Sequence, residues 1–246
     1  MKGYNHDSRQ LALMELLRTK LNGIVLKSEI RPRTLRAFSL LQGDNAGTVF
    51  NYKDTAKILD GESLLRDGRI FVGNLLSFGI AKVPVATAAT TNSQAVLAPG
   101  NMEVISYAHP DFFANSNVAV SSFGGQSSGT SSTTELNAIR MFFNGELEFK
   151  TDSNIRLEKF PMSRFSGIEQ YGAFVPRGLK VVDLFNAWLL DGSKDNTATI
   201  KYLAGKYDGI AGDLTTHRNF GVSEIIGFEI VCDKTKLAQI QAALGM

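Results

Sequence analysis

Cysteine is almost absent from this chain of 246 residues, in which only Cys232 occurs. A single cysteine cannot form an intrachain disulfide, which excludes a small secreted fold stabilised by such bonds. Long apolar runs are also missing, since none approaches the roughly 20 residues that span a bilayer. Arg9, Glu15, Arg18 and Lys20 interrupt the N-terminal segment, which therefore lacks the apolar stretch of a signal peptide. We expect a soluble protein that is made in the cytoplasm.

The short motifs that carry common enzyme chemistry are absent as well. The sequence has no phosphate-binding P-loop, no Gly-x-Gly-x-x-Gly fingerprint and no Gly-x-Ser-x-Gly nucleophile elbow. Its histidines, His6, His109 and His217, lack the spacing of metal ligands, and one cysteine cannot build a structural zinc site. The sequence predicts no catalytic residue, no cofactor, no metal and no enzymatic activity. An enzyme whose site is assembled from distant positions is kept as an alternative.

Turn signals, in contrast, are frequent. Asn or Asp is followed by Gly six times, and such pairs favour the tight turns that connect β-strands. The pairs are Asn22-Gly23, Asp60-Gly61, Asp67-Gly68, Asn144-Gly145, Asp191-Gly192 and Asp208-Gly209. The short β-rich runs between them have a spacing typical of an antiparallel β-sandwich or barrel. The predicted strands are Ile24–Ile30, Thr34–Leu41, Thr48–Tyr52, Arg69–Val72, Leu76–Lys82, Met102–Tyr107, Val118–Ser122, Ile139–Phe143, Glu146–Lys150, Ile155–Phe160, Leu179–Leu184, Thr197–Leu203 and Ser223–Cys232.

The clearest strand pattern runs over residues 139–160. Asn144-Gly145 lies between two strand-like runs, which is the strongest short-range signal for a two-residue hairpin. A second turn signal, Asp152-Ser153-Asn154, leads into the next run, and apolar and charged residues alternate throughout. The pattern predicts a three-strand meander with one apolar and one charged face. Glu146 and Glu148 belong to the charged face, so we interpret them as solvated rather than as a catalytic pair.

Helix is expected mostly at the two ends of the chain. Residues 8–21 combine a capping pattern with apolar residues at helical spacing, and this helix should stop at Asn22-Gly23. Its apolar stripe would pack on the body or on a neighbouring subunit. The stripe consists of Leu13, Met14, Leu16, Leu17 and Leu21. A short helix over residues 237–244 closes the chain, while Val182–Leu190 fits either a helix or a strand.

Two stretches poor in large apolar side chains break the strand pattern. Val85–Ala98 consists almost entirely of Ala, Thr, Val, Asn, Ser and Gln, and Ser121–Thr134 is rich in Ser, Thr and Gly. The second is expected to be a long loop, and long loops in compact β domains commonly carry interaction surfaces. We expect an N-terminal amphipathic helix or arm over residues 1–23. A β-sandwich body would follow over residues 24–246, either undivided or split within about residues 121–134.

Positive charge is concentrated near the N-terminus. The whole chain carries a net charge of +2, but residues 1–36 hold eight cationic side chains against three acidic ones. Such a segment fits either a solvated surface, which is the commoner case, or contact with a polyanion. The arginines around Pro32 lack the interleaved aromatics of a single-stranded nucleic-acid platform. The candidate polyanion contacts are Arg18, Lys20, Lys27, Arg31, Arg33 and Arg36.

The 16 phenylalanines include the adjacent pairs Phe112-Phe113 and Phe142-Phe143. Adjacent residues of a strand point to opposite faces of the sheet. If one ring enters the core, the other requires a second packed surface. A neighbouring subunit, or a helix or loop that covers the sheet, would provide that surface.

Four segments share their pattern with structural proteins of phage virions: Leu64–Val72, Leu76–Ile80, Phe143–Phe149 and Phe160–Phe165. Together, over about residues 60–165, they resemble the jelly-roll capsid proteins of tailless icosahedral bacteriophages. The resemblance implies an all-β fold, an antiparallel sandwich with one or two jelly rolls and short terminal helices. It further implies a virion protein that assembles, as trimers, into an icosahedral shell.

The resemblance also implies which partners the chain would have. These are copies of itself, other virion proteins and, through the basic N-terminus on the inner side, the genome or an internal membrane. A receptor- or carbohydrate-binding β-sandwich module is the alternative, because exposed aromatic side chains around Trp188 and Tyr202/Tyr207 could bind a ligand.

Overall fold

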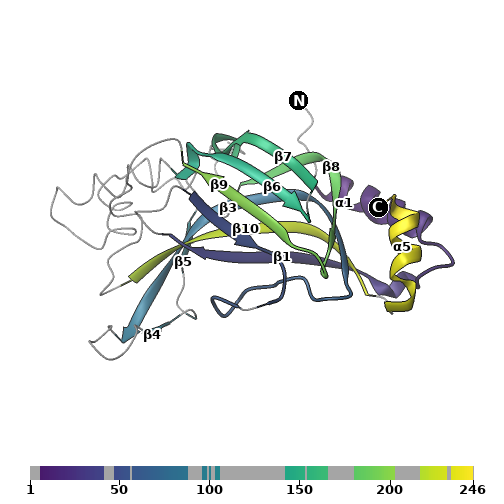
Figure 1. Cartoon of the computed structure of the whole chain (residues 1–246), viewed down its shortest axis with the longest axis horizontal. Helices are drawn as coiled ribbons and strands as arrows, with labels where there is room; N and C mark the ends of the chain where they lie inside the picture. The colour runs from purple at the N-terminus through teal and green to yellow at the C-terminus, as the bar shows by residue number, and fades with distance from the viewer. Residues whose placement is uncertain are drawn as a thin grey trace.

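A computed structural model shows two antiparallel β-sheets packed face to face, with two helices at one end (Figure 1). It describes residues 6–41, 47–55, 57–87, 96–98, 100, 103–105, 142–152, 154–165, 180–202, 217–231 and 234–245. Several expectations concern residues outside these ranges. They are the strand Val118–Ser122, parts of the strands Met102–Tyr107 and Ile139–Phe143, the loop Ser121–Thr134, the turn Asp208-Gly209, the pair Phe112-Phe113, and His109, Tyr207 and Cys232.

The strands belong to two sheets, which we name A and B. Sheet A contains β1 (Ile30–Leu40), β3 (Ile70–Thr87), β4 (Val96–Leu97), β5 (Glu103–Ile105), β8 (Val181–Asp191) and β10 (His217–Ile230). Sheet B contains β2 (Gly47–Asn51), β6 (Glu146–Thr151), β7 (Asn154–Pro161) and β9 (Asn196–Lys201). The helices that lie wholly within the described residues are α1 (His6–Lys20) and α5 (Leu237–Leu244), with the 3₁₀ turns η1 (Lys27–Glu29), η3 (Met162–Phe165) and η4 (Lys234–Lys236).

The strand pairing is that of a jelly roll. Apart from the short β4 and β5, the first strand pairs with the last (β1–β10) and the second with the seventh (β2–β9). The third pairs with the sixth (β3–β8) and the fourth with the fifth (β6–β7). The ladders β10–β3 and β9–β6 then join these pairs into the two sheets. This confirms the expected all-β sandwich and makes it a jelly roll. Each sheet takes strands from both sides of residues 121–134.

Sheet A is covered on both faces, which explains the nearly continuous apolar sequence of β3. All twelve residues from Ile70 to Ala81 are buried. Phe71 and Phe78 face sheet B, while Ile70 and Val83 face the other way and pack in separate clusters. Leu59, which precedes β3, covers one part of this outer face, and the helices cover another. The predicted strands Arg69–Val72 and Leu76–Lys82 are therefore parts of one strand.

The prediction of a strand over Ile24–Ile30 is wrong. Gly23 adopts a φ of 81°, and the backbone N–H groups of Ile24 and Val25 donate hydrogen bonds to the carbonyl oxygen of Leu21. The segment thus closes the C-terminal end of α1 with a turn. The short helix η1 follows, and the strand begins only at Ile30. Val182–Leu190, for which a helix and a strand were both expected, is a strand and lies in β8.

The N-terminal helix packs on the outer face of sheet A. Leu13, Leu17 and Leu21 are buried together with Ile240 of α5 and with side chains of β3 and β10. The expectation that Leu16 belongs to this stripe is wrong, since Leu16 is 51% exposed. One residue step turns a helical side chain by roughly 100°, which moves Leu16 away from the line of residues at four-residue spacing.

Polar contacts fix α1 to the same sheet. The Arg9 guanidinium forms an ion pair of 2.5 Å with the Asp183 carboxylate of β8. Gln10 Nε2 donates a hydrogen bond of 2.7 Å to Asn74 Oδ1 of β3. Together with the leucine stripe, these contacts make the helix an integral layer of the fold.

We expect Leu17→Ala to lower the free energy of unfolding by about 2–5 kcal/mol, because it leaves a cavity between α1 and sheet A. The matched substitution Leu16→Ala, one residue away in the same helix, should change it by less than about 0.5 kcal/mol. Urea unfolding of both variants checks the difference. Equal and small effects would show that α1 is undocked in solution.

The predicted hairpin at Asn144-Gly145 is not formed. Phe142 and Phe143 lie in a helical turn, and neither Asn144 nor Gly145 has the positive φ that this hairpin turn requires. Position 145 requires glycine for a steric reason instead. A Cβ atom there would lie 2.7 Å from the Lys201 carbonyl oxygen, which is too close. The strand after it, β6, instead pairs with β9 and β7. The second predicted turn is confirmed, with β6 and β7 joined at Asp152, whose φ is 56°.

The expectation that Phe142 and Phe143 point to opposite faces is also wrong. Both rings are buried in the core between the sheets, with centroids 5.0 Å apart in an edge-on arrangement. Adjacent side chains of a helical turn diverge by roughly 100° rather than 180°, so one core can accept both. This pair therefore gives no argument for a subunit contact.

Candidate functional site

Aromatic side chains fill the space between the two sheets. The ring of Phe78 in β3 lies 5.5 Å from that of Phe50 in β2 and 4.9 Å from that of Phe165, both edge-on. Phe149 of β6 lies 4.4 Å from Trp188 of β8. Two of these pairs join one sheet to the other, the third joins sheet A to η3, and together they form a closely packed core. In the described part of the chain, a functional site would therefore lie on the surface and not between the sheets.

Two of the three aromatic residues suggested for ligand binding belong to this core. Trp188 is buried, and so is Tyr202, whose hydroxyl shares a hydrogen bond of 2.7 Å with Thr48 Oγ1. Tyr207, the third of them, lies outside the described residues. Neither Trp188 nor Tyr202 presents the exposed ring on which a sugar could stack.

A small pocket of about 110 Å³ opens where the β6–β7 turn, the β8–β9 turn and α5 meet. Its polar side chains largely bond to one another. The Asp191 carboxylate accepts hydrogen bonds from Ser193 and, at 2.8 Å, from Gln241 Nε2 of α5, while Lys194 reaches Asp152 at 3.5 Å. The hydrogen bond from Gln241 to Asp191 therefore attaches α5 to the sandwich at this pocket.

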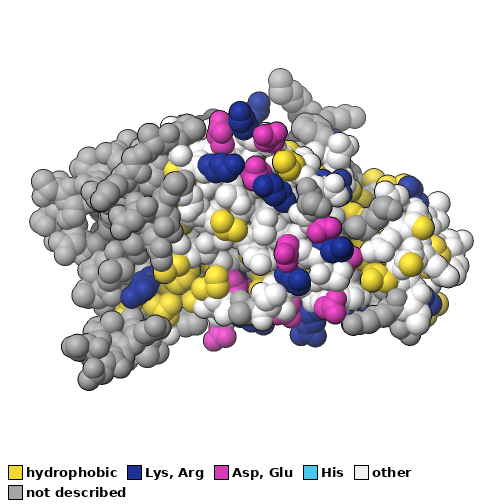
Figure 2. Space-filling view, in the orientation of Figure 1, with side chains coloured by type: hydrophobic (Ala, Val, Ile, Leu, Met, Phe, Trp, Pro, Cys, Tyr) yellow, Lys and Arg dark blue, Asp and Glu magenta, His cyan; other side chains and the backbone are white. Residues whose placement is uncertain are grey.

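The outer face of sheet B carries the charged side predicted for β6. Glu146, Glu148 and Lys150 point away from the buried Leu147 and Phe149. Side chains of both signs are interspersed over the visible strands (Figure 2).

Glu148 is the centre of this charged face. It forms ion pairs with Lys150 at 2.7 Å and with Lys201 of β9 at 3.4 Å. The hydrogen bond from Lys150, together with the two positive charges, holds the pKa of Glu148 below its usual range. The interpretation of Glu146 and Glu148 as outward-facing residues is therefore supported.

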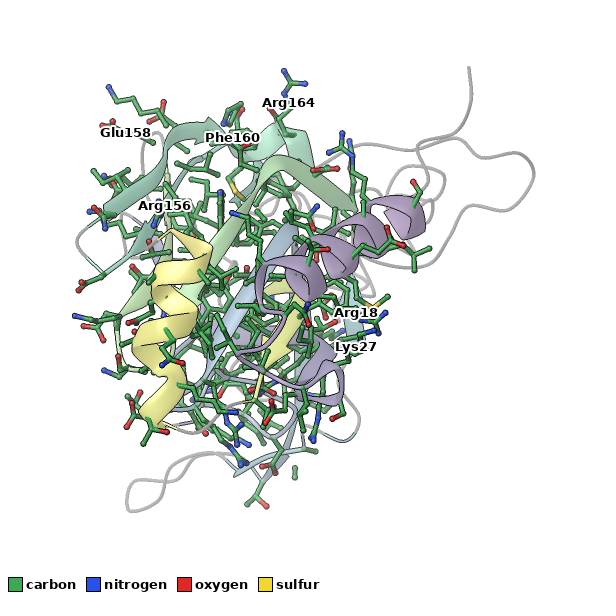
Figure 3. The ribbon with its side chains drawn as sticks, turned by 90° about the vertical axis from the view of Figure 1, so that its right-hand side faces the viewer. Arg18, Lys27, Arg156, Glu158, Phe160 and Arg164 are labelled. Atoms are coloured by element: carbon green, nitrogen blue, oxygen red, sulfur yellow. The ribbon has the colours of Figure 1, made fainter. Side chains whose placement is uncertain are left out.

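Strand β7 forms an edge of sheet B, since among the described residues it pairs only with β6. Charged side chains project from this end of the molecule, as Arg156, Glu158 and Arg164 show in Figure 3. Lys159 has a φ of 52°, Pro161 ends the strand, and the register with β6 is twice irregular. Charges, proline and irregularities are devices that protect an edge from pairing with another strand. Strand addition at β7 is therefore disfavoured as a mode of self-association.

The structure divides the six predicted polyanion contacts into two groups. Arg33 and Arg36 are engaged within sheet A. Arg33 pairs with Glu229 and donates a hydrogen bond of 2.7 Å to the Leu64 carbonyl oxygen. Arg36 lies directly opposite Glu224 in the β1–β10 ladder and pairs with it at 2.5 Å. Both arginines thus link β1 to its neighbours, and a polyanion would have to compete with these carboxylates.

The other four are Arg18, Lys20, Lys27 and Arg31, which we name the corner cations. None of them is in an ion pair among the described residues. Lys20, Lys27 and Arg31 are exposed, and Arg18 is half-buried. Figure 3 shows Arg18 and Lys27 at the same corner, where the chain leaves α1.

Sequence reasoning missed the carboxylates that separate the two groups. Glu224 and Glu229 lie in β10, about 190 positions beyond the arginines they neutralise. Their alternation with apolar residues in β10 indicates a strand, but nothing in the nearby sequence indicates which strand pairs with it. Only the β1–β10 register brings the opposite charges together.

Comparison of the chain with protein-family models, with curated proteins and with solved structures found no match. Among the described residues, no three His, Cys, Asp or Glu side chains are grouped as metal ligands. No helix in the described part is long and apolar enough to cross a bilayer.

Proposed function

We propose that this chain is a structural protein of a virus particle and assembles through copies of itself, as trimers, into an icosahedral shell of a bacteriophage. The observation that supports this most directly is the strand pairing, in which eight strands form one jelly roll with an aromatic core. Jelly rolls of this kind build viral capsids, and they also occur in lectins and cupins. Because one fold hosts several functions, the surfaces must distinguish them.

The described surfaces favour assembly over ligand binding. The core between the sheets is packed with rings, and the polar side chains that line the small pocket largely bond to one another. Large exposed apolar side chains are instead scattered over the outside, at Leu11, Leu16, Leu26, Val49, Ile58 and Ile155. Contacts between copies would bury such residues, whereas a binding module would concentrate aromatic side chains in one cleft.

The proposal predicts concentration-dependent self-association of the purified protein. Size-exclusion chromatography with light scattering should show a trimer at low concentration, and electron microscopy should show closed particles at high concentration. A monomer at every concentration would contradict the proposal. If that monomer also bound selected glycans on an array, the alternative of a carbohydrate-binding module would be favoured.

A further inference from the structure

The corner cations are held on a rigid part of the molecule. Arg18 and Lys20 lie in the last turn of α1, whose position is fixed by the Arg9–Asp183 ion pair and by buried leucines. The chain then turns back, so that Lys27 in η1 lies at the same corner as Arg18 (Figure 3), and Arg31 follows four residues later in β1. Cations near a helix C-terminus stabilise the helix, which accounts for the first two. Lys27 and Arg31 have no such role in α1.

The apolar residues of α1 are not arranged for insertion into lipid. Leu11 and Leu16 are both more than half exposed, but five residue steps place them about 140° apart around the helix axis. The exposed arc between them carries Ala12, Glu15 and Thr19. A helix that lies in a membrane surface instead gathers its large apolar side chains on one face.

We infer that the corner cations bind the phosphate backbone of a nucleic acid without reading its sequence. Four cations on a fixed surface, none with an ion-pair partner in the described part of the chain, match a chain of phosphates by charge. Residues 6–31 contain no Phe, Tyr or Trp, so this segment offers no aromatic ring on which bases could stack. The identity of the nucleic acid as a packaged genome rests on the proposed function, but the binding itself can be measured on unassembled subunits.

Binding of a fluorescein-labelled oligothymidylate, followed by fluorescence anisotropy, tests this inference. With four phosphate contacts, the logarithm of affinity should fall with that of salt concentration with a slope of about −3, or about 50-fold between 50 and 200 mM salt. The variant R18Q/K20Q/K27Q/R31Q should lose most of the affinity and of the slope. The variant K20Q/K27Q/R31Q retains the half-buried Arg18 and should lose most of the affinity while α1 stays folded.

The matched control removes four cations that lie in surface ion pairs: Lys53, Arg66, Lys194 and Lys201. The variant K53Q/R66Q/K194Q/K201Q has the same change in net charge and should keep both affinity and slope. An equal loss in the two fourfold variants, or no binding by the natural protein, would overturn the inference. Binding to vesicles of phosphatidylglycerol and phosphatidylcholine, without binding to the oligonucleotide, would overturn it in favour of a membrane.

The two proposals can fail separately. Particles that assemble from subunits unable to bind the oligonucleotide would refute the corner-cation inference alone. A protein that binds the oligonucleotide through these cations but stays monomeric would refute the shell function alone.

Discussion

Gly227→Ala is expected to lower the free energy of unfolding by about 3 kcal/mol or more, at the upper end of the cost of overpacking. Gly227 lies opposite Gly73 where the register between β10 and β3 shifts. A Cβ atom on Gly227 would overlap the carbonyl oxygen of Val72 and lie 2.6 Å from the Cα atom of Gly73. Because these neighbours are backbone atoms of a central strand, no side-chain rotation can relieve the overlap.

Gly100→Ala is the matched control, since a Cβ atom there has nothing within 4 Å. It should change the stability by less than about 0.5 kcal/mol. Urea unfolding, followed by circular dichroism, measures both variants. If Gly227→Ala were as stable as the control, the close contact between β3 and β10 would be incorrect, and with it the ladder that joins the two halves of sheet A.

Phe78→Ala is expected to cost about 3–5 kcal/mol, as for other large core aromatics. Its ring is fully buried and contacts rings of β2 and η3, so its removal opens a cavity between the sheets. Phe78→Leu should cost less, because leucine restores part of the lost volume. Thermal and urea unfolding of both variants measure these costs.

Val49→Ala provides the comparison from the outside of the same sandwich. Val49 lies in β2 and is 53% exposed, so its truncation should have little effect on the stability of the isolated subunit. A large effect of Val49→Ala together with a small effect of Phe78→Ala would mean that the core face of the sheets has been assigned to the wrong side.

Local sequence patterns located most of the described strands but not their ends. Alternation over Glu146–Lys150 correctly indicates a strand with a buried and a charged face. The Asn-Gly pair before it suggested a hairpin, yet the structure uses that glycine to let β9 approach. The same residue type serves a turn or a close contact, and nearby residues do not distinguish the two.

The candidate surface could be predicted only in part. The sequence shows that cations gather in residues 1–36, but Arg36 and its partner Glu224 are 188 positions apart. Without the register, Arg33 and Arg36 could not be separated from the corner cations. In α1, the spacing placed Leu17 correctly, whereas Leu16 was assigned to the stripe although it lies on its margin.

By itself, the sequence determined the elements of this protein: an all-β body, helices at the two ends, and the sets of side chains that must be buried. These follow from residues two to four positions apart, whose spacing along a strand or helix is set by local geometry. Only the tertiary structure decided that the strands pair first with last in one jelly roll, and which of the described cations form ion pairs across it. Both depend on ladders between distant segments, which form according to how the apolar faces fit together in one core.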